Sequence, residues 1–202
     1  MQGTFLKVLT VVALAGGLAG ATTISGSMTL NTTGATATGG TDLSNDTTLN
    51  WSTLSVAGTV GDYTVVPTST TASPDGSPLD LGDLSAFTFT LGLYGTFDAS
   101  GGVGSTIVSR SANFLDVYID GTFTPGPDVA TCAGPPSGSC QATDTSVRFA
   151  ISQSGGNAGS TGITATLNSP AIPPSAPEPA TMALLGSALI VVGLAGRKRL
   201  RR

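Results

Sequence analysis

Apolar and polar residues alternate along most of the central part of the chain. The alternation is clearest in four segments, which are residues 86–97, 114–123, 146–152 and 163–167. Weaker versions run over residues 24–30 and 51–60. A period of two places apolar side chains on one face of a β-strand and polar side chains on the other. The pattern therefore predicts an antiparallel sheet that is packed against a core on one side.

Short turn sequences separate these segments. They are Pro74-Asp75-Gly76, Ser100-Gly101-Gly102, Pro125-Gly126-Pro127 and Gly155-Gly156-Asn157. Residues of these types favour the backbone conformations of tight turns. No segment between residues 22 and 168 shows the 3.6-residue period of a helix. We therefore predict an all-β domain over residues 22–168, built as an antiparallel β-sandwich or jelly roll.

Two segments lack a clear pattern. Residues 32–45 consist almost entirely of threonine, glycine, alanine and serine, which favours an extended sheet edge or a flexible loop. Residues 169–179 contain five prolines. Because proline-rich segments adopt an extended, semi-rigid conformation, we predict a stalk there.

The N-terminal residues 1–21 have the layout of a secretory signal peptide. Lys7 supplies the positive charge at the start, and residues 8–18 form a short apolar stretch. The small residues Ala19 and Ala21 form a cleavage site of the A-x-A type, so we expect the mature chain to begin at Thr22. A buried N-terminal helix is the alternative interpretation.

The C-terminal region contains an uncharged apolar run over residues 180–196. A helix of this length reaches roughly 25 Å, which is enough to cross a thin bilayer. Five basic residues follow it, and these are Arg197, Lys198, Arg199, Arg201 and Arg202. Basic residues beside a membrane span resist translocation, so the pattern predicts a transmembrane helix with a cytoplasmic tail at residues 197–202.

Directly before the apolar run stands Pro177-Glu178-Pro179, which contains the only glutamate of the chain. Proline restricts its own backbone and that of its neighbour, so these residues are held in an extended conformation that a peptidase can grip. A Pro-Glu-Pro motif, an alanine-rich apolar helix and an arginine-rich end, in this order, resemble the PEP-CTERM sorting signal of Gram-negative bacteria.

This resemblance covers the C-terminal 26 residues, 177–202. It implies that an inner-membrane exosortase recognises Pro177, Glu178 and Pro179 and removes or exchanges the tail. The chain would thus be exported, held briefly in the inner membrane, and then displayed at the cell surface or released. An ordinary single-pass anchor with a proline-rich stalk is the alternative.

Without its two ends the chain is strongly acidic. Residues 22–176 contain eleven aspartates but only two basic residues, Arg110 and Arg148, which gives a formal net charge of 2 − 11 = −9. Nucleic acid requires a cationic surface, so it is excluded as a partner. Neutral glycans and calcium remain compatible with this charge.

The two cysteines, Cys132 and Cys140, are separated by a turn rich in glycine and proline. In an oxidising exported compartment such a pair is typical of a disulfide that closes a small loop. A metal role is disfavoured because the spacing is not C-x-x-C and the chain has no histidine.

The absence of histidine also excludes Ser-His-Asp and Cys-His catalysis, and the 22–176 region has no lysine for Ser-Lys catalysis. Asp116 and Asp120 lie on one strand face, but about 13 Å apart, which is too far for a glycosidase pair. We interpret them as solvated strand positions and expect no enzymatic activity. An aspartate-dependent hydrolase is the least favoured alternative.

Calcium is the one candidate cofactor. Asp75, Asp80 and Asp83 place three carboxylates within nine residues, and Ca²⁺ takes oxygen ligands from flexible loops. Asp42 and Asp46 form a weaker candidate of the same kind.

A carbohydrate site would use aromatic side chains for stacking. Trp51, Tyr63, Tyr94 and Tyr118 are the candidates, and Tyr118 is predicted to point outward between two aspartates. The competing function is therefore a carbohydrate- or calcium-dependent binding module. The leading hypothesis is an exported, non-enzymatic matrix protein, because PEP-CTERM systems are linked with exopolysaccharide and biofilm.

Overall fold

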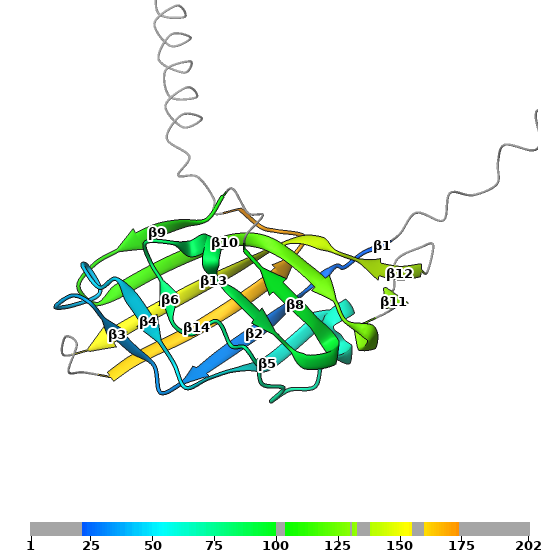
Figure 1. Cartoon of the computed structure of the whole chain (residues 1–202), viewed down its shortest axis with the longest axis horizontal. Helices are drawn as coiled ribbons and strands as arrows, with labels where there is room; N and C mark the ends of the chain where they lie inside the picture. Colours follow the sequence, from blue (N-terminus) through cyan, green and yellow to red (C-terminus); the bar gives the residue numbers. More distant parts are fainter. Residues whose placement is uncertain (1–21, 100–103, 130, 133–137, 155–159, 174–202) are drawn as a thin grey trace, which may run out of the picture.

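One large sheet of eight strands dominates the computed structural model (Figure 1). The structure describes residues 22–99, 104–129, 131–132, 138–154 and 160–173. The strand order is β5-β2-β14-β13-β10-β8-β7, and β9 lies beside β10. Their bounds are β2 (Gly26–Thr33), β5 (Thr53–Gly61), β7 (Thr88–Thr90), β8 (Gly95–Asp98), β9 (Thr106–Arg110), β10 (Phe114–Pro125), β13 (Thr143–Ser154) and β14 (Ser160–Ser169). All neighbours in this sheet are antiparallel.

Two small sheets and four short 3₁₀-helices complete the described part of the chain. One small sheet has the order β3-β4-β6 and the other the order β1-β12-β11, in which β1 and β12 are parallel. The strands are β1 (Thr22–Thr23), β3 (Thr36–Thr38), β4 (Thr48–Asn50), β6 (Leu79–Asp80), β11 (Thr131–Cys132) and β12 (Gly138–Gln141). The helices are η2 (Asp62–Val65), η3 (Leu84–Ala86), η4 (Gly92–Tyr94) and η5 (Pro127–Val129).

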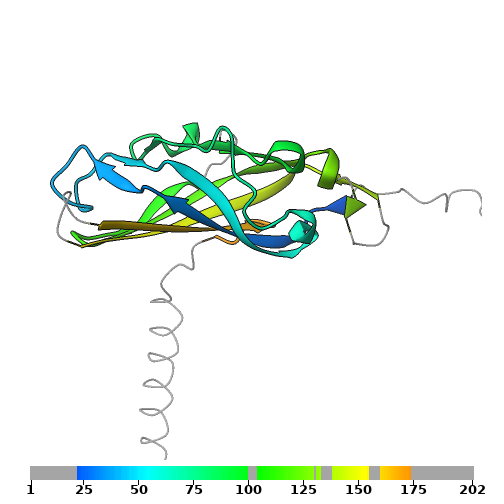
Figure 2. The same ribbon diagram turned by 90° about the horizontal axis from the view of Figure 1, so that it is seen from below.

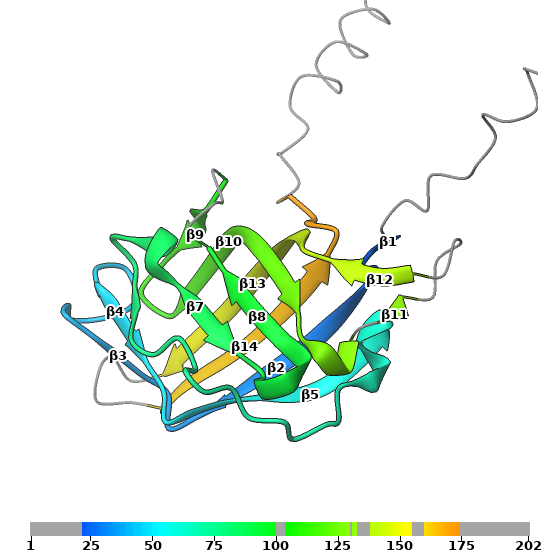
Figure 3. The same cartoon turned by 45° about the vertical axis from the view of Figure 1, so that its right-hand side comes forward.

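The large sheet curls into a half-barrel. Figure 3 shows β7 and β8 folding over in front of β14 and β2, and Figure 2 shows this green end of the sheet lying over the layer that contains β14. The all-β, antiparallel prediction is confirmed. The sandwich prediction needs correction, because the second layer consists of the curled end of the same sheet and a small three-stranded sheet.

The inner face of the half-barrel is filled by apolar side chains, as the alternation predicts. β10 and β13 pair over ten positions, and Val117, Ile119, Val147, Phe149 and Ile151 all point inward with no exposed surface. Burying an apolar side chain of this size stabilises the fold by about 1.5–3 kcal/mol. The core thus follows directly from the period-two pattern of the two longest strands.

Residues 86–97 form a hairpin in place of the single strand that the alternation predicts. The chain turns back at Gly92, whose φ of 57° is in the left-handed region that glycine adopts easily. Phe89 of β7 thereby pairs with Phe97 of β8, and the two rings stack with centroids 5.6 Å apart. Leu93, at the turn, is 61% exposed. The apolar alternation continues through the turn, so the pattern does not reveal the reversal.

Residues 32–45 are folded more tightly than their composition predicts. Leu43 is completely buried, and its carbonyl oxygen accepts a hydrogen bond of 2.6 Å from Nε of Arg110. The same guanidinium donates to the carbonyl oxygen of Asp46. One of the two arginines in the described residues therefore fixes this loop on the sheet through main-chain oxygens, a contact that crosses more than 60 residues of sequence.

The polar face of β10 is also not solvated as predicted. Asp116 is 6% exposed and Tyr118 is 4% exposed. The guanidinium of Arg148, on β13, donates two hydrogen bonds to the Asp116 carboxylate, at 2.9 and 2.6 Å. The pairing also raises the pKa of Arg148. A carboxylate held in this bidentate ion pair is a structural group and not a free acid or base.

Candidate functional site

The last described residues continue the fold where a semi-rigid, extended stalk was predicted. Ser169 ends β14 and is 3% exposed. Its Oγ lies 2.6 Å from the hydroxyl of Tyr63 and 2.5 Å from Oγ1 of Thr145. Thr145 in turn donates to the carbonyl oxygen of Thr143, at 2.8 Å. Because each hydroxyl has one proton, Ser169 must donate to Thr145, and Tyr63 must donate to Ser169.

The hydroxyl chain lies in the core. Tyr63 has no exposed surface, and its ring packs edge-on against Phe123 with centroids 5.2 Å apart. Burial raises the pKa of Tyr63 far above its ordinary value, against the smaller opposing effect of the nearby Ser169 and Thr145 hydroxyls. Tyr63 therefore keeps its proton at every physiological pH and remains a donor to the end of β14.

The segment after β14 is bound to the outer side of the sheet. The backbone N–H of Ala171 donates to the carbonyl oxygen of Asp144, at 2.9 Å, and that of Ile172 donates to Oγ of Ser146, at 3.1 Å. Figure 2 shows this orange segment on the side of the sheet opposite β3 and β4. The domain boundary predicted at residue 168 thus moves to at least Ile172. We call Ser169–Ile172 and their partners the C-terminal root.

The other end of the described chain is held by the neighbouring residues. Thr22 and Thr23 pair with Cys140 and Gln141, and the N–H of Ile24 donates to Oγ1 of Thr143, at 3.0 Å. The structure joins Cys132 and Cys140 by a disulfide with Cα atoms 5.3 Å apart. Residues 140–146 therefore hold both ends of the domain. The predicted signal cleavage residues Ala19 and Ala21 lie outside the described residues.

Only two residues of the sequence lie between Ile172 and residue 175. Residues 175–202 match the PEP-CTERM protein-sorting motif. The chain carries a PEP-CTERM sorting signal. This motif marks an exported protein that undergoes membrane-associated sorting by an exosortase and reaches the cell surface. No curated protein and no solved structure matches the chain.

The PEP-CTERM match includes Pro177, Glu178 and Pro179 and the basic residues from Arg197 to Arg202, all outside the described residues. Among the described residues, no helix is long and apolar enough to cross a membrane. The predicted span, residues 180–196, lies outside them. The structure therefore describes the domain that the PEP-CTERM signal sorts, together with the root from which the signal extends.

The proposed calcium ligands do not converge. Oδ1 of Asp75 accepts from the N–H of Ser77, and Oδ1 of Asp80 accepts from the N–H of Gly82. Oδ1 of Asp83 accepts from Oγ of Ser85, at 2.6 Å. In the described part of the chain, no three acidic or cysteine side chains come close enough to share a metal ion. Each aspartate instead stabilises its own turn, and the partner two residues further on is the sequence signal for this role.

The second acidic pair also has local partners. Oδ1 of Asp42 accepts from both the N–H and the Oγ of Ser44, and these hydrogen bonds lower the pKa of Asp42. Asp46 is completely buried, and its Oδ1 accepts from the N–H of Gly40, at 3.0 Å. Both aspartates therefore stabilise the same loop that Arg110 attaches to the sheet.

The aromatic side chains proposed as a sugar platform are mostly inside the domain. Trp51 stacks on Phe149, and its Nε1 donates to the carbonyl oxygen of Asp75, at 3.1 Å. Tyr63 and Tyr118 are buried, and burial raises the pKa of Tyr118. Tyr94 packs against the core. Stacking on an exposed ring is therefore not available to a ligand at Trp51, Tyr63 or Tyr118, whereas Tyr94 is half-buried.

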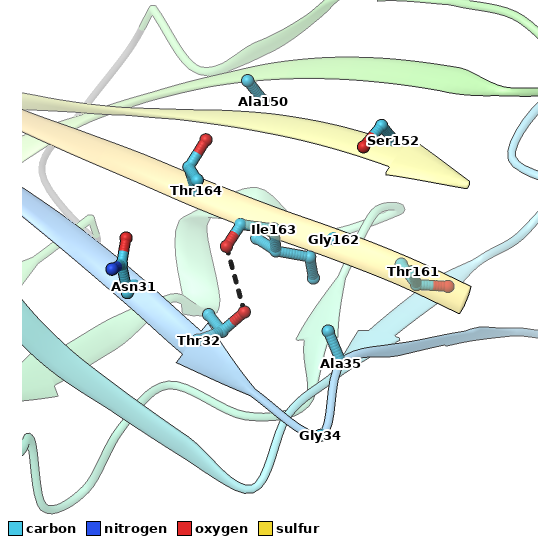
Figure 4. Close-up of a pocket in the computed structure, with 10 residues that line it drawn as sticks. All are labelled: Asn31, Thr32, Gly34, Ala35, Ala150, Ser152, Thr161, Gly162, Ile163 and Thr164. Atoms are coloured by element: carbon cyan, nitrogen blue, oxygen red, sulfur yellow. Dashed lines mark hydrogen bonds between the residues drawn. The ribbon is translucent and has the colours of Figure 1, made fainter. Parts of the chain in front are cut away.

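The outer face of the sheet contains a hollow that sequence reasoning missed (Figure 4). It has a volume of about 350 Å³ and lies where β2, β14 and β13 run side by side. Ala150 of β13 and Gly162 of β14 are exposed lining positions that contribute almost no side chain. The other lining residues are the apolar Ile163 and the polar or small residues Asn31, Thr32, Gly34, Ala35, Ser152, Thr161 and Thr164.

Exposed polar groups from all three strands line this outer hollow. Asn31 pairs with Thr164, and Thr164 pairs with Ala150, so the three form one row across the sheet. The side chains of Asn31, Ser152 and Thr164 are exposed, whereas Thr32 is engaged with the carbonyl oxygen of Ile163 (dashed in Figure 4). No charged residue is among the lining residues. The hollow offers amide and hydroxyl groups to a neutral, polar ligand.

Proposed function

We propose that the protein is a non-enzymatic component of the cell surface or extracellular matrix, delivered there by exosortase-dependent sorting. The observation that carries the proposal is the PEP-CTERM motif, which begins three residues after Ile172, a residue that is hydrogen-bonded to the β domain. The chain has no histidine, and the Asp116 carboxylate is held by Arg148. These features favour a structural or binding role over catalysis.

Fractionation of a host that makes the natural chain tests this proposal. We expect a full-length form in the inner membrane and a shorter form that lacks the tail. The shorter form should fractionate with the outer surface or with extracellular polysaccharide, and protease added to intact cells should digest it. A shorter form that stays in the periplasm and resists the added protease would contradict the matrix role.

The outer hollow supports a second candidate function, which is the binding of a neutral glycan. Its volume of about 350 Å³ is within the ~300–1,000 Å³ that is usual for small-ligand sites. Amide and hydroxyl groups can donate to and accept from sugar hydroxyls, while Ala150 and Gly162 leave room for the C–H face of a sugar ring. Since the acidic side chains near residues 75–83 stabilise turns, this binding should not need calcium.

Two threonine substitutions on one strand test the glycan candidate. Thr164→Val removes a hydroxyl from the hollow, and each lost hydrogen bond should weaken binding to purified neutral polysaccharide by about ten-fold. Thr166→Val is the matched control, because Thr166 is exposed on the same face of β14 but does not line the hollow. Affinity electrophoresis with and without EDTA measures both variants. Equal retardation of the two variants would exclude the hollow as the site.

A further inference from the structure

The sorting motif is attached to an interior strand of the large sheet. β14 pairs with β13 at nine positions, from Ser146↔Asn168 to Ser154↔Ser160. On its other side it pairs with β2 at six positions, from Asn31↔Thr164 to Gly26↔Ser169. Any force applied to the C-terminal side of Ser169 therefore enters the domain through a strand that is hydrogen-bonded on both sides.

The direction of this force relative to the strands decides how the hydrogen bonds share it. Ladder hydrogen bonds run perpendicular to antiparallel strands. If the far end of the sheet is held, near Ser154, a pull on Ser169 acts along β14 and loads both ladders together. If the start of β2 is held, near Gly26, the same pull separates Gly26 from Ser169, which are paired at the end of the β2–β14 ladder. The residue pairs of this ladder then open one after another.

The C-terminal root protects the point at which force enters. The Tyr63–Ser169–Thr145 hydroxyl chain is buried, and buried hydrogen bonds of this kind are strong because the surroundings have a low dielectric constant. The N–H groups of Ala171 and Ile172 add two bonds beyond the end of the strand. The last pair of β14 is therefore held against fraying.

We propose that β14 carries mechanical load. The load acts between the C-terminal attachment of the protein and a polymer that is bound at the distal end of β14 or on the outer face of the sheet. The proposal rests on the proposed function and adds to it that the sorted domain stays attached at the surface through its C-terminal end. In this arrangement the N-terminal end of the domain bears no load. The outer hollow lies towards the Ser160 end of β14, so a polymer bound there and the attachment point would pull on the strand in opposite directions.

Single-molecule pulling on the full chain in detergent tests the role of β14. One handle is a peptide tag after Arg202, and the other is a clickable amino acid at Ser154, at the far end, or at Thr23, at the near end. Both positions are exposed. We expect the Ser154 geometry to rupture at about twice the force of the Thr23 geometry or more, because many ladder hydrogen bonds must break together. A handle at Thr33, the far end of β2, should behave like the handle at Ser154.

Equal rupture forces in the two geometries, or a higher force from Thr23, would overturn the proposal. If the Ser154 handle disturbs folding, the Thr33 handle decides the comparison. The result is independent of sorting, since the handles replace the natural attachment. A higher rupture force in the Ser154 geometry, in a protein that is never processed, would refute the proposed function alone. Equal rupture forces in a protein that is processed would refute this inference alone.

Discussion

Glu178→Gln is expected to leave almost all of the protein uncleaved in the inner membrane. The side chain is the only glutamate of the chain and stands in the centre of the matched sorting motif. Losing a charge-assisted hydrogen bond to a binding partner costs ~1.5–3 kcal/mol, so processing should slow by ten-fold or more. Immunoblots of membrane and surface fractions over a time course give the ratio of full-length to shortened chain.

Asp128→Asn is the matched control for this substitution, because Asp128 is an exposed acid on η5 and lies outside the motif. It should be processed like the natural chain. Deletion of residues 197–202 should also block processing, since the basic residues fix the tail on the cytoplasmic side. Normal release of both the Glu178→Gln variant and the deletion variant would show that this region is not a sorting signal in the host.

Phe149→Ala should cause the largest loss of stability among single substitutions in the domain. Phe149 is completely buried, stacks on Trp51 with centroids 5.8 Å apart and meets Phe87 edge-on at 5.4 Å. Truncating a buried phenylalanine costs ~3–5 kcal/mol, because apolar contacts are lost and a cavity remains. Domains are typically stable by only ~5–15 kcal/mol, so part of the protein should be unfolded near physiological temperature.

Urea denaturation of the purified full chain, followed by far-ultraviolet circular dichroism, measures this loss. Val60→Ala is the control, because Val60 is 64% exposed and its truncation should change the free energy of unfolding by less than about 0.5 kcal/mol. A loss of less than about 1 kcal/mol for Phe149→Ala would mean that the aromatic cluster can close around the cavity.

The period-two pattern predicted the strands of the core because each of them keeps one face inward over its whole length. β10 and β13 follow this rule over ten paired positions. The same pattern could not reveal the reversal at Gly92, because apolar residues continue to alternate through the turn. It also placed Asp116 in solvent, although Arg148 on the neighbouring strand covers it. Periodicity describes one strand and says nothing of its neighbours.

The sorting motif was readable in the sequence because its parts are consecutive. The C-terminal root could not be predicted from the sequence, because Ser169 is hydrogen-bonded to Tyr63, 106 residues away, and to Thr145, 24 residues away. The five prolines of residues 169–179 favoured an extended stalk, and its first residues are indeed not helical. Their attachment to β13, however, depends on tertiary contacts. The outer hollow was missed because two of its lining residues, Ala150 and Gly162, have almost no side chain.

The attachment of both ends of the described domain to residues 140–146 has a consequence for the use of this domain in protein engineering. Thr23 pairs with Gln141 and Ala171 bonds to Asp144, so a host protein could enter and leave the domain at one place. Domains whose termini are close together tolerate insertion and circular permutation. We therefore expect that this β domain can be inserted into a loop of another protein without stretching that loop, and that the sorting tail can then be placed at the C-terminus of the host protein.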